Sequence, residues 1–260
     1  MIRFFVISCF AFLTALPVSA DFTMISQNLW RFGHRVGATD RDRTFKREVS
    51  GGDVVVVQEL MDPIQLGNLN PGNHVYLVSA LLGRGTYREA YGFLVRNTLG
   101  HGQVVTYADP NDDFEREPSF IEIRPPGRQT TWVGNVHVIF ARRRRIARRQ
   151  AEVRALPAAI NAATTNARRV VVGGDWNLPA THAAFDTLRG AGYTISPNDR
   201  TTLVIGGRQV SRYDHFASSP AVRVTGQATI NPSTLNRALD LPTWRTNISD
   251  HLGITCNVAD

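Results

Sequence analysis

The sequence is poor in cysteine and in simple patterns, and each absence excludes a class of protein. Cys9 and Cys256 are the only cysteines in 260 residues, so the stability of the chain must come from a packed core. There is no internal repeat, low-complexity linker or heptad pattern. With 43% hydrophobic and 20% charged residues, the chain is not disordered, collagen-like or a polytopic membrane protein. It is long enough for one large domain or two small ones.

Lysine is almost absent as well, yet the chain is strongly basic. Lys46 is the single lysine among 29 basic residues, and the formal net charge is +7. Because the arginine guanidinium forms paired hydrogen bonds with phosphate, this composition favours a polyanionic partner. A compositional bias of the source genome would explain the same excess of arginine.

The first twenty residues have the features of a signal peptide. Arg3 is followed by the apolar run FFVISCFAFLTAL, and small residues occupy Val18–Ala20 before Asp21. This pattern predicts a signal peptide over residues 1–20, export to the periplasm or the medium, and one domain over residues 21–260. A retained membrane anchor is the alternative, although the apolar run is short for one. The mature chain would carry 28 basic and 22 acidic residues, a charge of +6, and would not associate with membranes.

Short apolar runs typical of strands recur along the mature chain, with helix-compatible stretches between them. Strands are expected at Phe22–Ile25, Val54–Val57, Val75–Val78, Phe93–Val95, Phe120–Ile123, Trp132–Ile139, Val170–Val172 and Ile254–Val258. Helices are expected at Asp40–Val49, Ile146–Asn161 and Thr181–Arg189. Pro157 is expected to kink or end the second helix, and Thr181 to cap the third. This interleaving predicts one α/β domain with packed sheets.

Five of the apolar runs end in acidic, amide or imidazole side chains. They are SQNLW with Asn28, VVVVQE with Glu59, VGNVHV with His137, VVVGGDWN with Asp175 and Asn177, and ISDH with Asp250 and His251. Carboxylates at strand ends suit a hard divalent cation such as Mg²⁺, which prefers oxygen ligands. Two histidines near carboxylates can act as general base and general acid close to neutral pH. The five blocks in this order therefore indicate a catalytic site.

The order of these blocks resembles the endonuclease/exonuclease/phosphatase superfamily, and most closely its deoxyribonuclease I family. Three further stretches carry the narrower resemblance: GRGTYREAYGFLVR at Gly83–Arg96, FEREPSFIEI from Phe114, and NLWRFG from Asn28. The similarity extends from about Phe22 to Cys256. It implies an α/β fold of two packed mixed β-sheets flanked by helices, which is a four-layer sandwich.

The resemblance also implies a metal site and a phosphate site. Glu59 would be the main Mg²⁺ ligand, with Asp250 and Asn28 beside it and Mn²⁺ able to replace Mg²⁺. Asp175, Asn177 and Asn28 would hold the scissile phosphate or a second cation. Such a metal would offset phosphate charge and stabilise the more negative transition state.

Two histidine–carboxylate pairs are implied in the same way. His251, oriented by Asp214, would deprotonate the attacking water, and His137, oriented by Glu89, would donate a proton or hydrogen bond to the leaving oxygen. A carboxylate partner fixes the imidazole tautomer and stabilises the imidazolium. Without the Glu89 block, His137 would be interpreted as a core histidine on a buried strand.

The expected DNA contacts match the family only in part. Tyr87 matches its minor-groove tyrosine, and Arg116 matches a phosphate contact. Met61 stands where the family has its minor-groove arginine. Trp30 replaces another arginine of the first-strand loop, although Arg31 follows at once. The resemblance therefore implies contacts with the DNA backbone and, in part, with the minor groove.

Arginines are concentrated in one segment after the His137 block. They are Arg142, Arg143, Arg144, Arg145, Arg148, Arg149 and Arg154. Phosphate contacts of this kind give a sequence-independent affinity that falls steeply with salt. A solvated helix start and a nuclear-import-like signal are the alternatives.

Together these features predict an exported, Mg²⁺-dependent endonuclease that hydrolyses DNA with little sequence specificity. The resemblance implies 5′-phosphate and 3′-hydroxyl products, and a monomer would suffice. A calcium site is a weaker expectation, because only Asp199, Thr201 and Thr202 match the family's calcium loop. Duplex DNA, single-stranded DNA and RNA are all compatible with these blocks.

Three other functions remain open at this point. A nuclease like the cytolethal distending toxin B subunit would also be exported, but that family lacks the YREAY-type strand. Lipid phosphodiesterases and phosphatases of the superfamily would use the same machinery, but the basic charge and the FEREP block argue against a lipid head group. A catalytically inactive binding module would not need the GDxN and SDH blocks.

Overall fold

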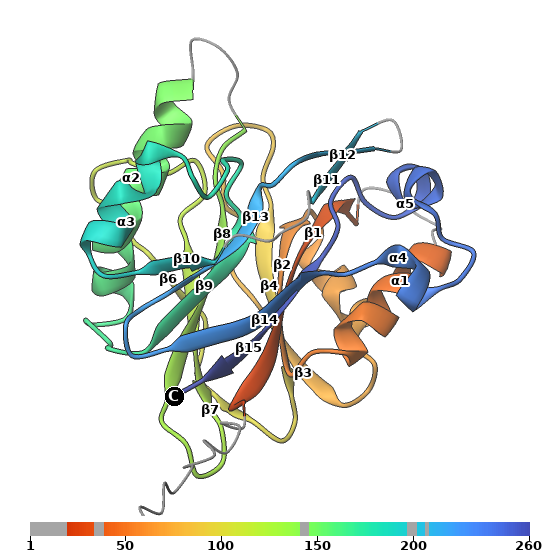
Figure 1. The fold of residues 1–260 in the computed structure, drawn as a ribbon, viewed down its shortest axis with the longest axis horizontal. Helices are drawn as coiled ribbons and strands as arrows, with labels where there is room; N and C mark the ends of the chain where they lie inside the picture. The colour runs from red at the N-terminus through yellow and green to blue at the C-terminus, as the bar shows by residue number, and fades with distance from the viewer. Residues whose placement is uncertain (1–19, 34–38, 141–145, 197–201, 206–207) are drawn as a thin grey trace, which may run out of the picture.

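A computed structural model describes residues 20–33, 39–140, 146–196, 202–205 and 208–260. Two β-sheets pack face to face in the centre, and helices cover the outer face of each (Figure 1). The expected four-layer α/β sandwich of mixed sheets is therefore confirmed. Within the described ranges, no helix has the length and apolar character needed to cross a membrane.

The first sheet has six strands in the order β14-β15-β1-β2-β4-β3. Its β1–β2 pair is parallel and the other pairs are antiparallel. The strands are β1 (Phe22–Phe32), β2 (Val54–Leu60), β3 (His74–Val78), β4 (Ala90–Arg96), β14 (Arg223–Thr229) and β15 (Ile254–Ala259).

The second sheet has seven strands, in the order β10-β13-β9-β8-β7-β5 with β6 also paired to β7. Its one parallel pair is β8–β9. The strands are β5 (Gly100–His101), β6 (Val105–Thr106), β7 (Ser119–Arg124), β8 (Thr131–His137), β9 (Val170–Asp175), β10 (Thr194–Ser196) and β13 (Asp214–Ser218). A separate small hairpin joins β11 (Leu203–Ile205) and β12 (Arg208–Ser211).

Helices cover the outer face of each sheet. The first sheet is covered by α1 (Thr39–Ser50), η1 (Pro63–Leu69), α4 (Pro232–Leu235) and α5 (Leu241–Asn247), and the second by α2 (Ile146–Ala163), η3 (Ala183–Phe185) and α3 (Asp186–Gly190). The α2 helix continues past Pro157 to Ala163, so of the two expected effects, a kink or an end, the end is wrong. Buried Leu156, Ala159 and Ile160 on both sides of Pro157 pack against the sheet, and this burial outweighs the lost hydrogen bond. The expected Thr181 cap is also wrong, because the His182 side chain accepts from Ala184 N instead.

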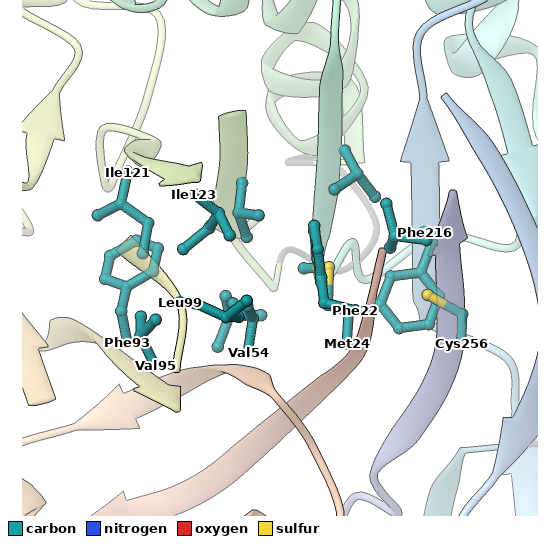
Figure 2. Packing of buried hydrophobic residues seen from close by; sticks show 14 of the residues in the cluster. Phe22, Met24, Val54, Phe93, Val95, Leu99, Ile121, Ile123, Phe216 and Cys256 are labelled. Atoms are coloured by element: carbon teal, nitrogen blue, oxygen red, sulfur yellow. The ribbon is translucent and has the colours of Figure 1, made fainter. Parts of the chain in front are cut away.

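The main core lies between the sheets. Alternating residues of the VVVV run point to opposite faces of β2: Val54 and Val56 face the other sheet, whereas Val55 and Val57 face the helices. Figure 2 shows Phe93 and Phe216 packed in the inner layer with Cys256, which is buried with a free thiol.

One polar link crosses the core below the site. Gln58 Nε2 donates to Asn135 Oδ1 at 2.7 Å, and Asn135 Nδ2 donates to the Val57 carbonyl at 3.0 Å. Both side chains are fully buried and join β2 to β8, so they fix the register of the two sheets beneath the strand ends.

Candidate active site

The strands that deliver the site residues are distorted where they end. The β1–β2 register shifts between Asn28 and Phe32, and the β2–β4 register shifts between Val57 and Leu60. Within these irregular stretches Trp30, Arg31 and Glu59 have φ values of 48°, 56° and 57°. A left-handed backbone at residues other than glycine is strained and persists only where the surrounding structure enforces it. These irregularities interrupt the alternation of side chains between the two faces of each strand, and they direct the three side chains toward one edge of the sheets.

Asp175, at the end of β9, occupies the centre of the site. Its Oδ2 lies 3.5 Å from Nε2 of His137 and 3.5 Å from Nε2 of His251. Asn28 Nδ2 donates to the same oxygen at 3.2 Å, and Asn177 N donates to Oδ1 at 2.9 Å. Burial raises the pKa of Asp175 to about 6, although both imidazoles oppose that shift. Both imidazoles thus face a single carboxyl group.

His251 is held from behind by Asp214, as predicted. Its Nδ1 lies 2.8 Å from Asp214 Oδ2, at the start of β13. Burial alone would lower the pKa of His251, but the carboxylates of Asp214 and Asp175 outweigh it and raise the pKa well above its ordinary value. Asp175, Asp214 and His251 offer ligand atoms within 4.8 Å of one another. Asp214 and His251 share a hydrogen bond, and His251 Nε2 lies 3.5 Å from Asp175 Oδ2, so the His251 ring lies between the two carboxyl groups.

His137 is held in the same way by Glu89, as predicted. Its Nδ1 lies 2.6 Å from Glu89 Oε1. Burial and Arg116 lower the pKa of His137, but Glu89 and Asp175 outweigh them and raise it. We call Glu89, His137, Asp175, Asp214 and His251 the floor of the candidate site, or the floor for short. All five side chains are at most 6% exposed.

Arg116 lies beside the Glu89–His137 pair. Its Nε and Nη2 donate to the His137 carbonyl at 3.2 and 3.1 Å, and Nε is 3.6 Å from Glu89 Oε1. The side chain is only 6% exposed, yet it also borders a cavity beside His137. Sequence reasoning gave Arg116 a phosphate contact, and the structure adds that it positions His137.

Glu59 and Asp250 have the chemistry of a divalent-cation site. Both border the cavity, and Asp250 Oδ1 is buried without a hydrogen-bond partner among the described residues. Burial raises the pKa of Asp250, and the like charge of Glu59 adds to the shift. Two neighbouring carboxylates with an orphaned oxygen fit a hard cation, which would offset their repulsion. Asn28, also expected as a ligand, contacts this pair as a donor: its Nδ2 donates to Glu59 Oε1 at 3.2 Å, while its Oδ1 accepts from Trp30 N at 2.9 Å.

A cavity of about 740 Å³ is bordered by His137 of the floor and by the Glu59–Asp250 pair. Three aromatic side chains border it, and we call Trp30, Tyr87 and Phe140 the aromatic rim. The Tyr87 hydroxyl donates to Glu59 Oε2 at 2.8 Å, and the Arg31 guanidinium lies 5.2 Å from the centre of its ring. The two expected DNA contacts Tyr87 and Arg31 are therefore packed on each other beside the carboxylate pair.

Several expected residues cannot be placed. Arg142, Arg143, Arg144 and Arg145 lie outside the described residues, as do Asp199 and Thr201 of the calcium pattern and residues 1–19 of the expected signal peptide. Thr202 is described and buried, and its Oγ1 accepts from Tyr213 N and Asp214 N.

Sequence reasoning missed residues that support the floor from within the same motifs. Ser249 of the ISDH block donates to the Asn28 carbonyl at 2.8 Å and accepts from His251 N at 3.1 Å. Tyr91 of the YREAY block accepts from His137 N at 2.8 Å. Trp244 Nε1 donates to the His251 carbonyl at 2.8 Å from α5, and no motif pointed to it.

Comparisons with known proteins bear on the family and on the fold. A deoxyribonuclease of Thioalkalivibrio sp. (strain K90mix) is 28% identical over 213 residues, which cover 76% of this chain and 58% of that protein. The match thus spans little more than half of the relative. D. rerio TDP2 complexed with a single-strand DNA product has a TM-score of 0.65 at 19% identity, covering 92% of this chain and 98% of that chain.

A phosphatase has the same fold. The Bacteroides thetaiotaomicron mannosyl-6-phosphatase has a TM-score of 0.67 at 13% identity, covering 92% of this chain and 99% of that chain. At such low identities these structures show only a shared fold. The family described as Endonuclease/Exonuclease/phosphatase matches residues 25–251, which include every residue of the floor. This chain therefore belongs to the endonuclease/exonuclease/phosphatase family.

Proposed function

We propose that this chain is a Mg²⁺-dependent deoxyribonuclease that hydrolyses phosphodiester bonds in DNA. One observation carries the proposal: two carboxylate-backed imidazoles face Asp175 from 3.5 Å, beside the Glu59–Asp250 pair. When two imidazoles lie on opposite sides of a bound phosphate, one can remove a proton from water and the other can supply a proton to the leaving oxygen. Hydrolysis of a phosphodiester requires both transfers.

The residues divide this work as follows. His251 Nε2 would take the proton from the attacking water as the new P–O bond forms. His137 Nε2 would give its proton to the 3′-oxygen as the old P–O bond breaks, which leaves a 5′-phosphate and a 3′-hydroxyl. Asp214 and Glu89 hold the Nδ1 atoms, so that each Nε2 points toward Asp175, beside which the phosphate would bind. When bound at Glu59 and Asp250, a divalent cation would neutralise phosphate charge and lower the pKa of the adjacent His251 by repulsion.

Two arguments favour DNA over other phosphate esters. The Thioalkalivibrio relative is named a deoxyribonuclease, and TDP2 was solved with a single-strand DNA product. In this chain, Arg31, Arg84, Arg116 and Arg148 all border the cavity. Several guanidinium groups around one cavity suit a polyanion more than a single small phosphate ester.

The function is tested by incubating the purified mature chain with supercoiled plasmid, with and without Mg²⁺ and chelator. The same preparation is assayed on sphingomyelin, phosphoinositides and a sugar phosphate. We expect Mg²⁺-dependent nicking, the same activity with Mn²⁺, and no turnover of the other substrates. Turnover of a lipid or sugar phosphate without nicking would overturn the proposal and leave a different activity within the family.

We also propose that the enzyme works outside the cytoplasm, because residues 1–20 have the pattern of a cleavable signal peptide. Expression of the full chain in a bacterial host, followed by cell fractionation and N-terminal sequencing, tests this. We expect a secreted or periplasmic product that begins at Asp21. A product that keeps Met1 and stays in the cytoplasm would contradict it.

A further inference from the structure

Two aromatic side chains border the cavity from opposite sheets. Trp30 follows Asn28 by two residues in the irregular end of β1, in the first sheet. Phe140 follows His137 by three residues, just after β8 of the second sheet. Both line the same cavity. Asn28 and His137 thus each have an aromatic residue close by in the sequence. Each ring is placed to contact the substrate from the sheet that carries it.

Each of these rings is packed against an arginine. The Arg245 guanidinium of α5 lies 4.5 Å from the centre of the Trp30 ring. The Arg149 guanidinium of α2 lies 5.2 Å from the centre of the Phe140 ring, and Arg149 also hydrogen-bonds the Asn177 carbonyl. Arg149 is only 5% exposed, so it is a fixed support. Phe140 nevertheless remains 48% exposed at the cavity, which is unusual for a supported aromatic ring.

The residues expected to read a duplex are unavailable for that role. Met61, at the position of the family's minor-groove arginine, is 8% exposed and belongs to the core. The Tyr87 hydroxyl is bonded to Glu59, and its ring packs with Arg31. A tyrosine fixed in this way supports the carboxylate pair and has little freedom to enter a groove.

We propose that Trp30 and Phe140 are stacking platforms for unpaired bases on either side of the scissile phosphate, and that the preferred substrate is single-stranded DNA. A base inside a B-form duplex is stacked on both faces, so its π-surface cannot lie on a protein ring. An unpaired base can do so, and such stacking tolerates any sequence because every base has a π-face. This inference rests on the DNA-hydrolase function proposed above.

The test uses a short oligonucleotide in which one natural phosphodiester is flanked by phosphorothioate linkages, so that cleavage occurs at a defined position. It is assayed as a single strand, as a duplex, and as a single strand with abasic residues on both sides of the cleavable bond. Variants Trp30→Ala and Phe140→Ala are compared with the wild type and with Tyr76→Ala. Tyr76 is a matched control, since it is an aromatic residue 49% exposed on β3, away from the cavity.

We expect the wild type to cleave the single strand at least about tenfold faster than the duplex, in kcat/KM, and each cavity variant to lose about fivefold or more on the single strand. On the abasic strand, both variants should match the wild type, because the stacked base is missing. Trp30→Phe should retain most of the single-strand activity, and Tyr76→Ala all of it.

Two results would overturn the stacking proposal. One is a duplex rate equal to or above the single-strand rate. The other is a loss in Trp30→Ala and Phe140→Ala that is the same on the intact and abasic strands, which would indicate a structural effect only. A wild-type enzyme that cleaves none of these oligonucleotides in Mg²⁺ would instead contradict the DNA-hydrolase function itself, so the two failures are distinct.

Discussion

The floor and the aromatic rim meet at one cavity, which His137 of the floor and all three rim residues border, but they are built in different ways. Floor residues are buried, come from strand ends, and are fixed by hydrogen bonds between side chains, as in the 2.6 Å contact of His137 with Glu89. Rim residues are half-buried or exposed and are held by arginines packed on their rings, as with Arg245 on Trp30. The comparison indicates that proton transfer depends on the preorganised floor, whereas the choice of substrate depends on the rim.

The largest effect should come from the floor histidines. His137→Ala and His251→Ala should each lower kcat on DNA by about 10²- to 10⁴-fold, the usual size of a positioned proton transfer. The double variant should lose less than the product of the two, because residues that act as one unit are non-additive. Asp214→Asn and Glu89→Gln should give smaller losses. Steady-state kinetics of the variants measure these losses. Near-wild-type rates for both single variants would contradict the catalytic role of the floor histidines.

The carboxylate pair at the edge of the floor should come next. Glu59→Gln keeps the shape but removes the charge, and a bound cation contributes several kcal/mol, so activity should fall by about 10²-fold. Excess chelator should abolish wild-type cleavage, and added Mg²⁺ or Mn²⁺ should restore it. Isothermal titration with Mg²⁺ should show weaker binding to the variant. Undiminished cleavage in chelator would contradict the metal assignment.

A smaller effect is expected from the run of four arginines at residues 142–145. Replacing Arg142, Arg143, Arg144 and Arg145 with glutamine should weaken DNA binding at low salt and leave the chemistry of the floor unchanged. The slope of log affinity against log salt should flatten by up to roughly one unit per lost phosphate contact. Fluorescence anisotropy over a salt series measures this slope. An unchanged slope would mean that the run is simply a solvated surface.

Replacement of Glu48 in α1 should have the smallest effect on activity, but it should change the stability of the fold. It is buried like the floor carboxylates, but neither of its oxygens has a hydrogen-bond partner among the described residues. Burial raises the pKa of Glu48 from 4.5 to about 8. The folded chain therefore keeps a proton that the unfolded chain releases, and stability present below pH 4.5 is lost progressively as the pH rises to about 8.

Glu48→Gln isolates this contribution. Relative to the wild type, the variant should gain stability by about 1.4 kcal/mol per pH unit across that window, up to a few kcal/mol, with no further gain above it. Denaturant unfolding of both proteins at several pH values measures the difference. A difference that does not change with pH would show that Glu48 is ionised in the folded chain.

The contrast between floor and rim also explains what the sequence could predict. His137 and Asp175 end the neighbouring strands β8 and β9, so the expectation that apolar runs deliver them to one edge is confirmed. His251 instead lies between α5 and β15, so the expected strand before it is wrong and its position was predicted by its motif alone. The interleaved apolar runs predicted one α/β domain with packed sheets, and the family resemblance added the two mixed sheets flanked by helices. Strands β13 and β14 were missed, because short polar-rich runs such as Arg223–Thr229 carry little apolar periodicity.

Tyr87 of the rim was expected from its motif, but the local geometry of Trp30, Glu59 and Phe140 could not be predicted, for a physical reason. Trp30 and Glu59 depend on bulges with positive φ, a conformation that local propensity disfavours for these residue types. The support of Phe140 by Arg149 joins a loop to a helix through a contact that no spacing encodes. Arg116 was recognised by its motif, but its contacts with His137 and Glu89 depend on tertiary packing.

The central claim is that the two imidazoles of the floor perform different proton transfers, and one measurement tests it directly. His137→Ala and His251→Ala are assayed on DNA and on a nucleotide nitrophenyl phosphodiester, whose nitrophenolate leaves without a proton. The account predicts that the defect of His137→Ala shrinks strongly on the nitrophenyl ester, while the defect of His251→Ala persists because water still needs a base. Rescue of His251→Ala alone, or equal defects on both substrates, would contradict it.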